Sequence, residues 1–346
     1  MDLYHLRHVP WIDSQLIYHA QARVGVEGIN ILAPAEPYVC IGYHQDLAQE
    51  VDVAYCQAQG IPVFRREVGG GAVFLDGEQI FYQIVLHKDH PLVQGDKATF
   101  YRRMLEPVAQ AYTDLGVQCR YRAVNDVITE QGRKISGTGA ATIGDHVVLV
   151  GNLIADFDYK TMARVLRVPD EKYRDKVFKS IQENLTTLKR ETGKTFEWDE
   201  MVRPLIERFE GVLGPLQEAA LPQVIYSEME QLKPQFQSEE WLYKKGRWQP
   251  GRDVKIATGV NVIQRIHKAP GGLIRATVEV KDERLSAVSL SGDFFCYPMD
   301  AIGQLEDILV GTSLDQVERA LIDFYAQHEI ETPGLDVGDW LKVLIG

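Results

Sequence analysis

The sequence predicts an α+β protein, in which a large mixed or antiparallel β-sheet flanked by helices is followed by a small C-terminal α+β domain. Strand-like runs occur in groups separated by helical runs, and they do not alternate regularly with single helices. The chain has 346 residues, which is enough for two domains. The residue pattern changes near residue 250, so we expect domains at 1–250 and 251–346.

The first third of the chain alternates between helical and strand-like runs. Apolar residues at helical spacing predict helices over 11–25, 46–60 and 97–116. Short runs rich in β-branched and aromatic residues predict strands over 30–34, 38–44, 61–66, 72–74 and 80–86. We expect the last two of these strands to form a hairpin about Asp76-Gly77.

The remainder divides into three stretches. Residues 119–157 are rich in strand-forming residues cut by glycines, and residues 158–215 are predicted to be largely helical. Residues 222–250 have a mixed pattern, within which 239–251 are predicted to be a loop-rich bridge and are a hinge candidate. Beyond it, alternating apolar and polar residues around Asp282-Glu283 predict a two-stranded hairpin, with helices over 302–310 and 313–328.

The composition is that of an ordinary soluble chain, with 45% hydrophobic and 25% charged residues. No apolar run approaches the roughly 20 residues needed to cross a bilayer, and the first residues lack the pattern of a signal peptide. The net charge of −12 argues against a nucleic-acid partner. We therefore expect a cytoplasmic monomer that has no nucleic-acid or membrane partner.

The segment FRREVGGGAVF, residues 64–74, is the first candidate for chemistry. Arginine forks bind phosphate oxygens in pairs, and consecutive glycines leave backbone N–H groups uncovered by any Cβ. Arg65 and Arg66 next to Gly69, Gly70 and Gly71 therefore suggest a cradle for phosphoryl or carboxylate oxygens. The alternative is a tight glycine hairpin with arginines on the surface.

The segment NDVITEQGRKISGTGAA, residues 125–141, is the second candidate. Lys134 lies between glycines in a strand-forming run, where its ammonium group either extends to solvent or binds an anion. In the second case it would stabilise charge on a phosphoryl group and polarise an adjacent carbonyl group. Asn125 and Asp126 suit Mg²⁺, or alternatively they begin a turn.

These two segments, in this order, resemble the paired signature of lipoate–protein ligases, which share a superfamily with biotin–protein ligases and octanoyltransferases. Residues 37–52, 239–250 and 272–295 also resemble segments of two-domain lipoate ligases. The likeness extends over nearly the whole chain. It implies a catalytic domain of the biotin and lipoate ligase fold at 1–250 and an accessory domain at 251–346.

The resemblance implies an enzyme that activates lipoic or octanoic acid with ATP and Mg²⁺ to an acyl-adenylate, then passes the acyl group to a lysine. The implied acceptors are lipoyl domains of 2-oxoacid dehydrogenase subunits, the glycine cleavage H protein or a related lipoate-binding protein. Lys134 is the implied catalytic residue, and Asn125 and Asp126 are the implied metal ligands. The implied nucleotide- and acyl-binding residues are Arg65, Arg66, Gly69, Gly70, Gly71, Ala72, Ser136, Gly137 and Thr138.

The sequence departs from the family pattern at three places that concern the acyl pocket. Leu75 stands where the family usually has a histidine, Glu78-Gln79 where it has Gly-Asn, and Val150-Gly151 where it has His-Gly. The apolar residues near the first two positions are candidates for an acyl tunnel, although strand alternation directs only about half of them inward. These candidates are Val73, Phe74, Ile80 and Phe81.

Cys119 supports an alternative mechanism. Its spacing from Lys134 resembles that of the catalytic cysteine in ATP-independent octanoyl- and lipoyl-transferases, where the thiol forms a thioester. A thiol beside Arg120, Arg122 and Lys134 would have a lowered pKa. The sequence after Cys119 differs from those transferases, and they generally lack the C-terminal module. A biotin ligase is disfavoured by its different glycine motif, and an acyl-binding regulator without activity would lack the chemistry of Lys134.

Overall fold

The computed structural model describes residues 1–168, 170–245 and 260–346. These residues form two compact units. The first unit comprises Met1–Cys40, Val51–Phe64 and Val73–Ser238, and the second comprises Ile41–Glu50, Arg65–Ala72 and Glu239–Gly346. The predicted domain boundary at 250/251 and residues 246–251 of the hinge candidate lie outside the described residues, so both stay predictions.

The first unit is built on a mixed eight-stranded sheet, which confirms the predicted α+β class. β1 pairs in parallel with both of its neighbours, and all other neighbouring strands of this sheet pair antiparallel. The spatial order of the strands is β11 (Gln217–Glu218), β1 (Asp2–Val9), β2 (Gly28–Pro34), β6 (Gln79–His87), β10 (His146–Ile154), β9 (Lys134–Ile143), β8 (Asp126–Thr129) and β7 (Cys119–Arg122).

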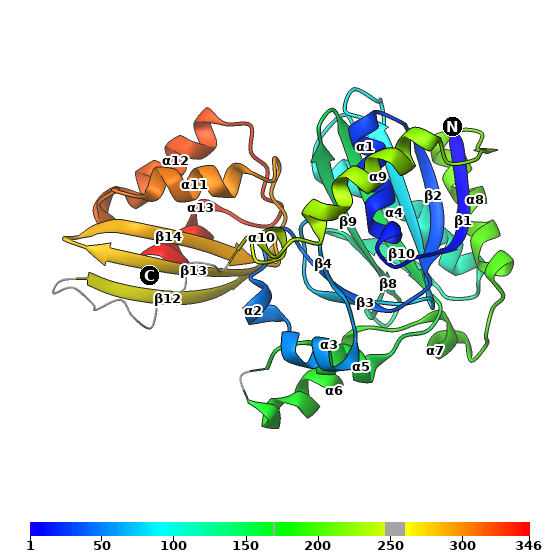
Figure 1. The fold of residues 1–346 in the computed structure, drawn as a ribbon, viewed down its shortest axis with the longest axis horizontal. Coiled ribbons are helices and arrows are strands. Elements are labelled where there is room, and N and C mark those ends of the chain that lie inside the picture. The colour runs from blue at the N-terminus through cyan, green and yellow to red at the C-terminus, as the bar shows by residue number, and fades with distance from the viewer. Residues whose placement is uncertain (169, 246–259) are drawn as a thin grey trace. The chain divides into compact units, whose positions relative to one another are not determined.

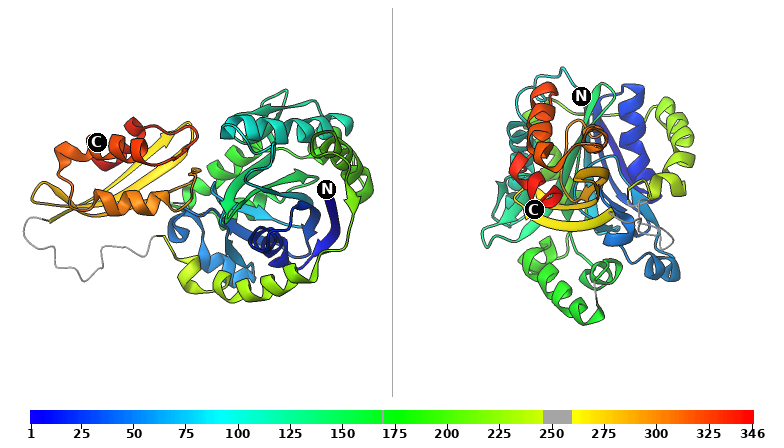
Figure 2. Two further views of the ribbon diagram at one scale, coloured as in Figure 1. Left: turned by 90° about the horizontal axis from the view of Figure 1, so that it is seen from above. Right: turned by 90° about the vertical axis from the view of Figure 1, so that its left-hand side faces the viewer.

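Helices cover both faces of this sheet (Figure 1). α4 (Lys97–Asp114) and α8 (Trp198–Leu213) pack against the alternate apolar residues of the central strands and form the main core. α1 (Asp13–Val24), which contacts α9 (Gln223–Phe236), lies on the other face (Figure 2). The remaining helices of this unit are α3 (Val53–Gln59), α5 (Tyr159–Val165), η1 (Glu171–Tyr173), α6 (Arg174–Asn184) and α7 (Leu188–Thr192).

The second unit contains an antiparallel three-stranded sheet, in the order β12 (Val260–Ala269), β13 (Gly272–Lys281) and β14 (Arg284–Gly292). The predicted hairpin about Asp282-Glu283 is confirmed by the pairing of β13 with β14. Alternate residues of β13 form one core with the three C-terminal helices. The helices of this unit are α2 (Leu47–Glu50), α10 (Glu239–Leu242), α11 (Ala301–Leu309), η2 (Leu314–Gln316), α12 (Val317–Gln327) and α13 (Val337–Leu344).

Two predictions of local structure were wrong, and one helix was missed. The turn at Asp76 is present, but β5 (Val73–Leu75) and β6 form no hairpin, because β5 pairs with β3 (Tyr38–Ile41) in a small sheet that also contains β4 (Val63–Arg65). The mixed stretch 222–250 contains the 14-residue helix α9, which was not predicted. The predicted helix over 46–60 is two helices, because Asp52 leaves helical geometry and caps α3 by accepting from the Tyr55 N–H.

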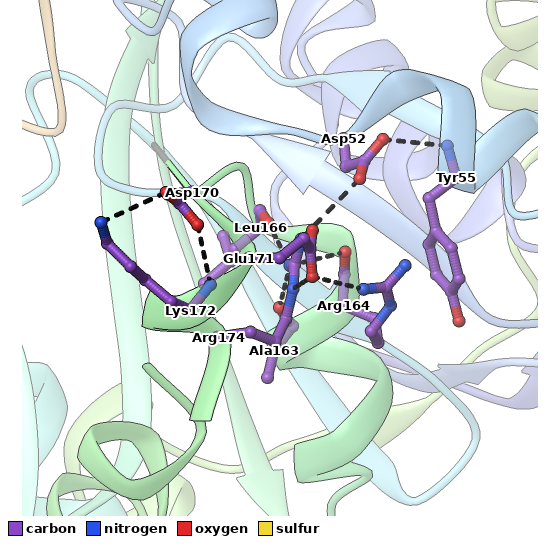
Figure 3. Close-up of polar contacts among 9 residues, drawn as sticks. All are labelled: Asp52, Tyr55, Ala163, Arg164, Leu166, Asp170, Glu171, Lys172 and Arg174. Carbon is purple, nitrogen blue, oxygen red and sulfur yellow. Dashed lines mark hydrogen bonds and ion pairs between the residues drawn. The ribbon is translucent and has the colours of Figure 1, made fainter. Parts of the chain in front are cut away.

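A buried arginine organises the helical segment that follows β10 (Figure 3). Nη1 of Arg174 donates to the carbonyl oxygens of Ala163, Arg164 and Leu166 at 2.6, 3.1 and 2.7 Å, where α5 ends. Its Nε and Nη2 donate to the carboxylate of Glu171 at 3.1 and 2.6 Å. Arg174 thus provides the partners that the last carbonyl groups of a helix lack. None of the described helices is long and apolar enough to cross a membrane.

The sheet opens at one end of the pair β9–β10. The backbone pairing of these strands runs from His146 opposite Ile143 to Gly151 opposite Thr138. Beyond that point β10 continues along β6 and β9 continues along β8. The fully buried hydroxyl of Tyr112 joins the separated strands, since it donates to the Ile135 carbonyl at 2.6 Å and accepts from the Ile154 N–H at 2.7 Å.

Replacing Tyr112 with Phe should therefore lower the free energy of unfolding by roughly 2–4 kcal/mol, because two buried backbone groups lose their partner. Urea unfolding of the full chain, followed by tryptophan fluorescence, measures this change. Tyr226→Phe is the matched control, since Tyr226 is 43% exposed. Equal stability of the Tyr112→Phe variant and the wild type would contradict this role of the hydroxyl.

Candidate active site

Lys134 is the first residue of β9, at the end of the sheet where β9 has left β10. Its Nζ lies 2.7 Å from Oδ1 of Asp126, the first residue of β8. The side chain of Lys134 is 35% exposed and that of Asp126 is 18% exposed. The ammonium group is thus held by a carboxylate and is still within reach of solvent, as a group that binds an anionic substrate needs to be.

Asp126 has a second cationic partner, because Nη2 of Arg122 lies 2.8 Å from its Oδ2. Burial raises the pKa of Asp126, but Lys134 and Arg122 together lower it by more, so the pKa lies below its ordinary value. Asp126 is therefore ionised at neutral pH. Asp126 and Gly137 face each other across the β8–β9 pair, which fixes the carboxylate beside the strand that carries Lys134.

The residues after Lys134 contact their neighbours closely. A Cβ on Gly137 would lie 3.1 Å from Cε and 3.2 Å from Nζ of Lys134, so the lysine side chain lies directly over this glycine. The side-chain amide of Asn125 donates to the Thr138 carbonyl. The hydroxyl of Ser136 donates to the Asn152 carbonyl at 2.5 Å. The structure thus brings together Asn125, Asp126, Lys134, Ser136, Gly137 and Thr138.

Three polar residues that join the residues after Lys134 to β6 and β10 were not predicted as site residues. Tyr82 lies 2.8 Å from the Thr138 hydroxyl through its own hydroxyl group. Asn152 accepts from the Gly137 N–H and donates to Gln79. Gln79 and Asn152 lie at or beside two of the departures from the family pattern, and those departures were the signal that marked them. Tyr82 had no such signal, because its position depends on pairing across three strands.

A segment from the end of α6 runs beside Lys134. The Thr186 N–H donates to the Lys134 carbonyl at 2.8 Å, and Leu185 forms a parallel bridge with Lys134. Glu191 anchors this segment, because Arg133 donates to both of its carboxylate oxygens and the Thr186 hydroxyl donates to one of them. The backbone at Lys134 is therefore fixed on the side that faces this segment.

The arginine–glycine motif lies in the second unit, from Arg65 to Ala72. Arg65 is fully buried, and its guanidinium donates to the carbonyl oxygens of Gly42, Tyr43, Gln45 and Leu242. A guanidinium in this setting has to exchange carbonyl partners before it can bind a phosphate. Nη2 of Arg66 donates to the carbonyl oxygens of Gly69 and Gly71 at 2.7 and 2.9 Å, so it sets the shape of the glycine loop.

Two glycines of the triplet, Gly69 and Gly70, are closely packed. A Cβ on Gly69 would lie 2.8 Å from the Phe294 carbonyl oxygen. The Gly70 N–H donates to the same oxygen at 3.3 Å, and the Phe295 ring lies against Gly70. Gly70 has a φ of 90°, a value that favours glycine.

The described part of the hinge candidate, residues 239–245, is attached within the second unit. The indole N–H of Trp241 donates to the Arg65 carbonyl at 2.8 Å. Lys245 lies 2.7 Å from Glu306, and both side chains are mostly buried. Lys244 lies 4.1 Å from the centre of the Tyr43 ring.

The apolar residues proposed for an acyl tunnel differ in their surroundings. Ile80 belongs to the main core with α4 and α8, whereas Phe81 lies on the opposite face of β6. Phe74 is buried and Val73 is 36% exposed. Their role in binding an acyl chain stays a prediction.

Cys119 does not have the environment that was expected for a nucleophile. Strand alternation in β7 places Cys119 and Tyr121 against the main core, and places Arg120 and Arg122 on the other face. Burial raises the pKa of the Cys119 thiol to about 12, and the charge of Glu191 adds to this effect. The expected lowering of this pKa by neighbouring cations was wrong, because the cations lie on the opposite face of the sheet.

Asn125 and Asp126 provide an amide and a carboxylate, which are donor types that suit Mg²⁺. The carboxylate oxygens of Asp126 already contact Lys134 and Arg122, so a metal ion would share this residue with two cations. Within the described ranges, no group of three or more His, Cys, Asp or Glu residues is arranged to hold a metal ion. The donor types fit a metal that takes most of its ligands from phosphate and water.

Residues 14–210 match the model of the lipoyl protein ligase A/B catalytic domain. The chain therefore belongs to the lipoate–protein ligase A/B family.

Relatives within this family include both kinds of enzyme. The chain is 27% identical over 290 residues to the lipoate–protein ligase LplJ of Bacillus subtilis, with 83% of this chain and 81% of that protein covered. It is 24% identical over 231 residues to the octanoyltransferase LipM of Kyrpidia tusciae, with 60% and 84% covered. A bipartite lipoate–protein ligase structure from Thermoplasma acidophilum superposes with a TM-score of 0.62 at 27% identity, over 69% of this chain and 94% of that one.

The Lys134–Asp126 ion pair generates a prediction about acid stability. Asp126→Asn should lower the free energy of unfolding by about 1–3 kcal/mol at pH 7, since two charge-assisted hydrogen bonds lose their ionised acceptor. The difference from the wild type should shrink once the pH falls below 3.8, the ordinary pKa of aspartate, and vanish below the lowered pKa of the folded protein. Urea unfolding between pH 7 and pH 3 measures it.

Asp145→Asn is the matched control for this comparison, because Asp145 pairs with Lys88 at the surface, with side chains 67% and 53% exposed. Its effect should be much smaller at every pH. A constant difference between the wild type and Asp126→Asn across the whole pH range would show that the pair contributes nothing through its charge.

Proposed function

We propose that this chain is a lipoate–protein ligase. It activates lipoate or octanoate with ATP to the acyl-adenylate and transfers the acyl group to the lysine of a lipoyl domain. One observation carries the proposal: a partly exposed ammonium group, Lys134, is held by an ionised carboxylate at the open end of β9. The cysteine considered as a nucleophile, Cys119, lies on the other face of the sheet with a raised pKa.

In the first step an oxygen of the substrate carboxylate attacks the α-phosphorus of ATP. The bond from that phosphorus to the bridging oxygen breaks, and pyrophosphate leaves. This reaction needs alignment and neutralisation of charge, and it needs no protein nucleophile. Lys134 supplies a positive charge for the α-phosphate oxygens. Asp126 keeps the ammonium group in place before the substrates bind. Arg122, the second partner of Asp126, keeps the Asp126 carboxylate ionised.

In the second step the ε-amine of the acceptor lysine attacks the acyl carbon of the adenylate. The bond from the acyl carbon to the phosphate oxygen breaks, AMP leaves, and the amine releases one proton to solvent. Lys134 donates a hydrogen bond to the acyl carbonyl oxygen as negative charge develops on it. The acceptors that we propose are the lipoyl domains of 2-oxoacid dehydrogenase subunits, the glycine cleavage H protein or a related protein.

We propose that Arg66, Gly69, Gly70, Gly71 and Ala72 bind the nucleotide and the acyl group in the same reaction. The role of Arg65 is proposed to be indirect, because its donors hold the carbonyl oxygens around residues 42–45 and Leu242. Ser136, Gly137 and Thr138 provide backbone and hydroxyl groups next to Lys134. Mg²⁺ at Asn125 and Asp126 would supply additional positive charge for the phosphates when it is bound with ATP.

The alternative is an ATP-independent acyltransferase that uses Cys119. The similarity to an octanoyltransferase makes it a real alternative. A thiol with a pKa of about 12 is almost wholly protonated at neutral pH, and only the thiolate attacks a thioester efficiently. The environment of Cys119 therefore favours the ligase.

The proposal is tested by incubating the full chain with Mg-ATP, lipoate or octanoate, and a lipoyl domain. We expect release of pyrophosphate and an increase in the intact mass of the acceptor by the acyl group. Lys134→Ala should reduce the rate at least about 100-fold, as removal of a transition-state donor does in other enzymes. Cys119→Ala should stay within about twofold of the wild type.

Lys88→Ala is the matched control for Lys134→Ala, because Lys88 also pairs with an aspartate at 2.6 Å but lies exposed in another part of the unit. It should retain full activity. Acyl transfer from an acylated carrier without ATP, abolished in Cys119→Ala, would establish the transferase instead. An acceptor whose mass changes neither with the free acids and Mg-ATP nor with an acylated carrier would overturn both mechanisms.

A further inference from the structure

Asn152 replaces backbone pairing at the place where β9 and β10 separate. The last backbone pair is Gly151 opposite Thr138, so Gly137 has no backbone partner on β10. The Gly137 N–H donates to Oδ1 of Asn152 at 3.0 Å instead. A side-chain amide thus continues the hydrogen bonding of β10 for one more residue of β9.

Gln79 fixes the orientation of the Asn152 amide. Nδ2 of Asn152 donates to Oε1 of Gln79 at 2.8 Å, and Nε2 of Gln79 donates to the Phe74 carbonyl at 3.1 Å. This series of hydrogen bonds begins at the Gly137 N–H, which can only donate, and ends at the Phe74 carbonyl, which can only accept. Each amide therefore has a single orientation that satisfies both of its neighbours.

This series ends beneath Lys134. The Lys134 side chain lies over Gly137, with Cε and Nζ at 3.1 and 3.2 Å from where a Cβ would be. The space left by the missing Cβ is where the lysine side chain lies, so the position of Gly137 sets the surface on which the ammonium group rests. Gln79 is 1% exposed, so water cannot easily replace it as the partner of Asn152.

We infer that Asn152 and Gln79 are positioning residues for the reaction: the series Phe74–Gln79–Asn152 holds Gly137, and through Gly137 it sets the position of the Lys134 ammonium group. This inference rests on the proposed function, because it assigns a purpose to the position of Lys134. The same series of hydrogen bonds connects β5, which contains Phe74, with β9, which begins at Lys134, and both strands belong to the first unit.

The test is a mutant cycle on the rate of acyl-adenylate formation, measured as pyrophosphate release at saturating ATP and lipoate. Asn152→Ala should lower kcat about 10- to 50-fold, and Gln79→Met about 5- to 10-fold, with the KM for ATP within about threefold of the wild type. The double variant should be no slower than Asn152→Ala, because the two residues act in series. Neither substitution should slow the reaction further when Lys134 is already Ala.

The last comparison separates positioning from a general structural role, since a structural defect would lower the rate of Lys134→Ala as well. Gln79→Met preserves side-chain volume and touches neither Lys134 nor Gly137, so it keeps the test valid if Asn152→Ala does not fold. The matched control is Gln94→Met, in which an exposed glutamine loses its hydrogen bond to the Lys88 carbonyl. It should have wild-type kcat.

Additive losses in the Lys134→Ala background, or unchanged kcat in both Asn152→Ala and Gln79→Met, would overturn the inference and leave the ligase activity standing. A wild-type protein that forms no acyl-adenylate would instead overturn the proposed function. Full activity of Lys134→Ala would remove the catalytic role of this lysine, and the positioning role would fall with it.

Discussion

The separation of β9 from β10 is the constraint on which the candidate site depends. After Thr138 and Gly151, each strand continues with its outer neighbour, β8 or β6, and the backbone groups between them lose their usual partners. A buried N–H or carbonyl group without a partner costs about 1–3 kcal/mol, so side chains have to replace the missing ladder. Tyr112, Ser136 and Asn152 do so. Lys134 lies on the part of β9 that is freed by this separation.

Strand alternation then assigns different chemistry to the two faces of the sheet. Across β7 and β8, Arg122 and Asp126 face each other on the side that carries the Lys134 ammonium group. Cys119 and Tyr121 face the main core on the other side. Cys119 and Lys134 are close in sequence, but they lie on opposite faces of the sheet, so no cation among the described residues lies beside the thiol. An ammonium group with a carboxylate partner suits adenylate chemistry, whereas a buried thiol beside the charge of Glu191 does not suit thioester chemistry.

The sequence sufficed to predict the fold class, because local periodicity and the order of the motifs determine it. It did not predict which strands pair. The turn at Asp76 was expected to form a hairpin, but β5 joins β3 and β6 joins β2, a choice made by contacts distant in sequence. Helix α9 was hidden by the mixed composition of residues 222–250. For the site, the lysine motif predicted which residues gather around Lys134. Tyr82 was missed because only sheet register brings it to Thr138, and Asn152 was marked only by its place beside a departure from the family pattern.

The glycines of the two motifs show that a glycine-rich sequence does not by itself reveal why glycine is needed. Three glycines suggest conformational freedom, yet Gly70 is the only one of the triplet with a positive φ. A Cβ on Gly70 would lie 3.2 Å from Nη2 of Arg66, and a Cβ on Gly137 would lie 3.2 Å from Nζ of Lys134. In both motifs a glycine provides the space in which a cationic side chain rests. An alanine at either position would move the positive charge without removing it. Glycine is therefore needed here to place the cationic side chain as well as to shape the backbone.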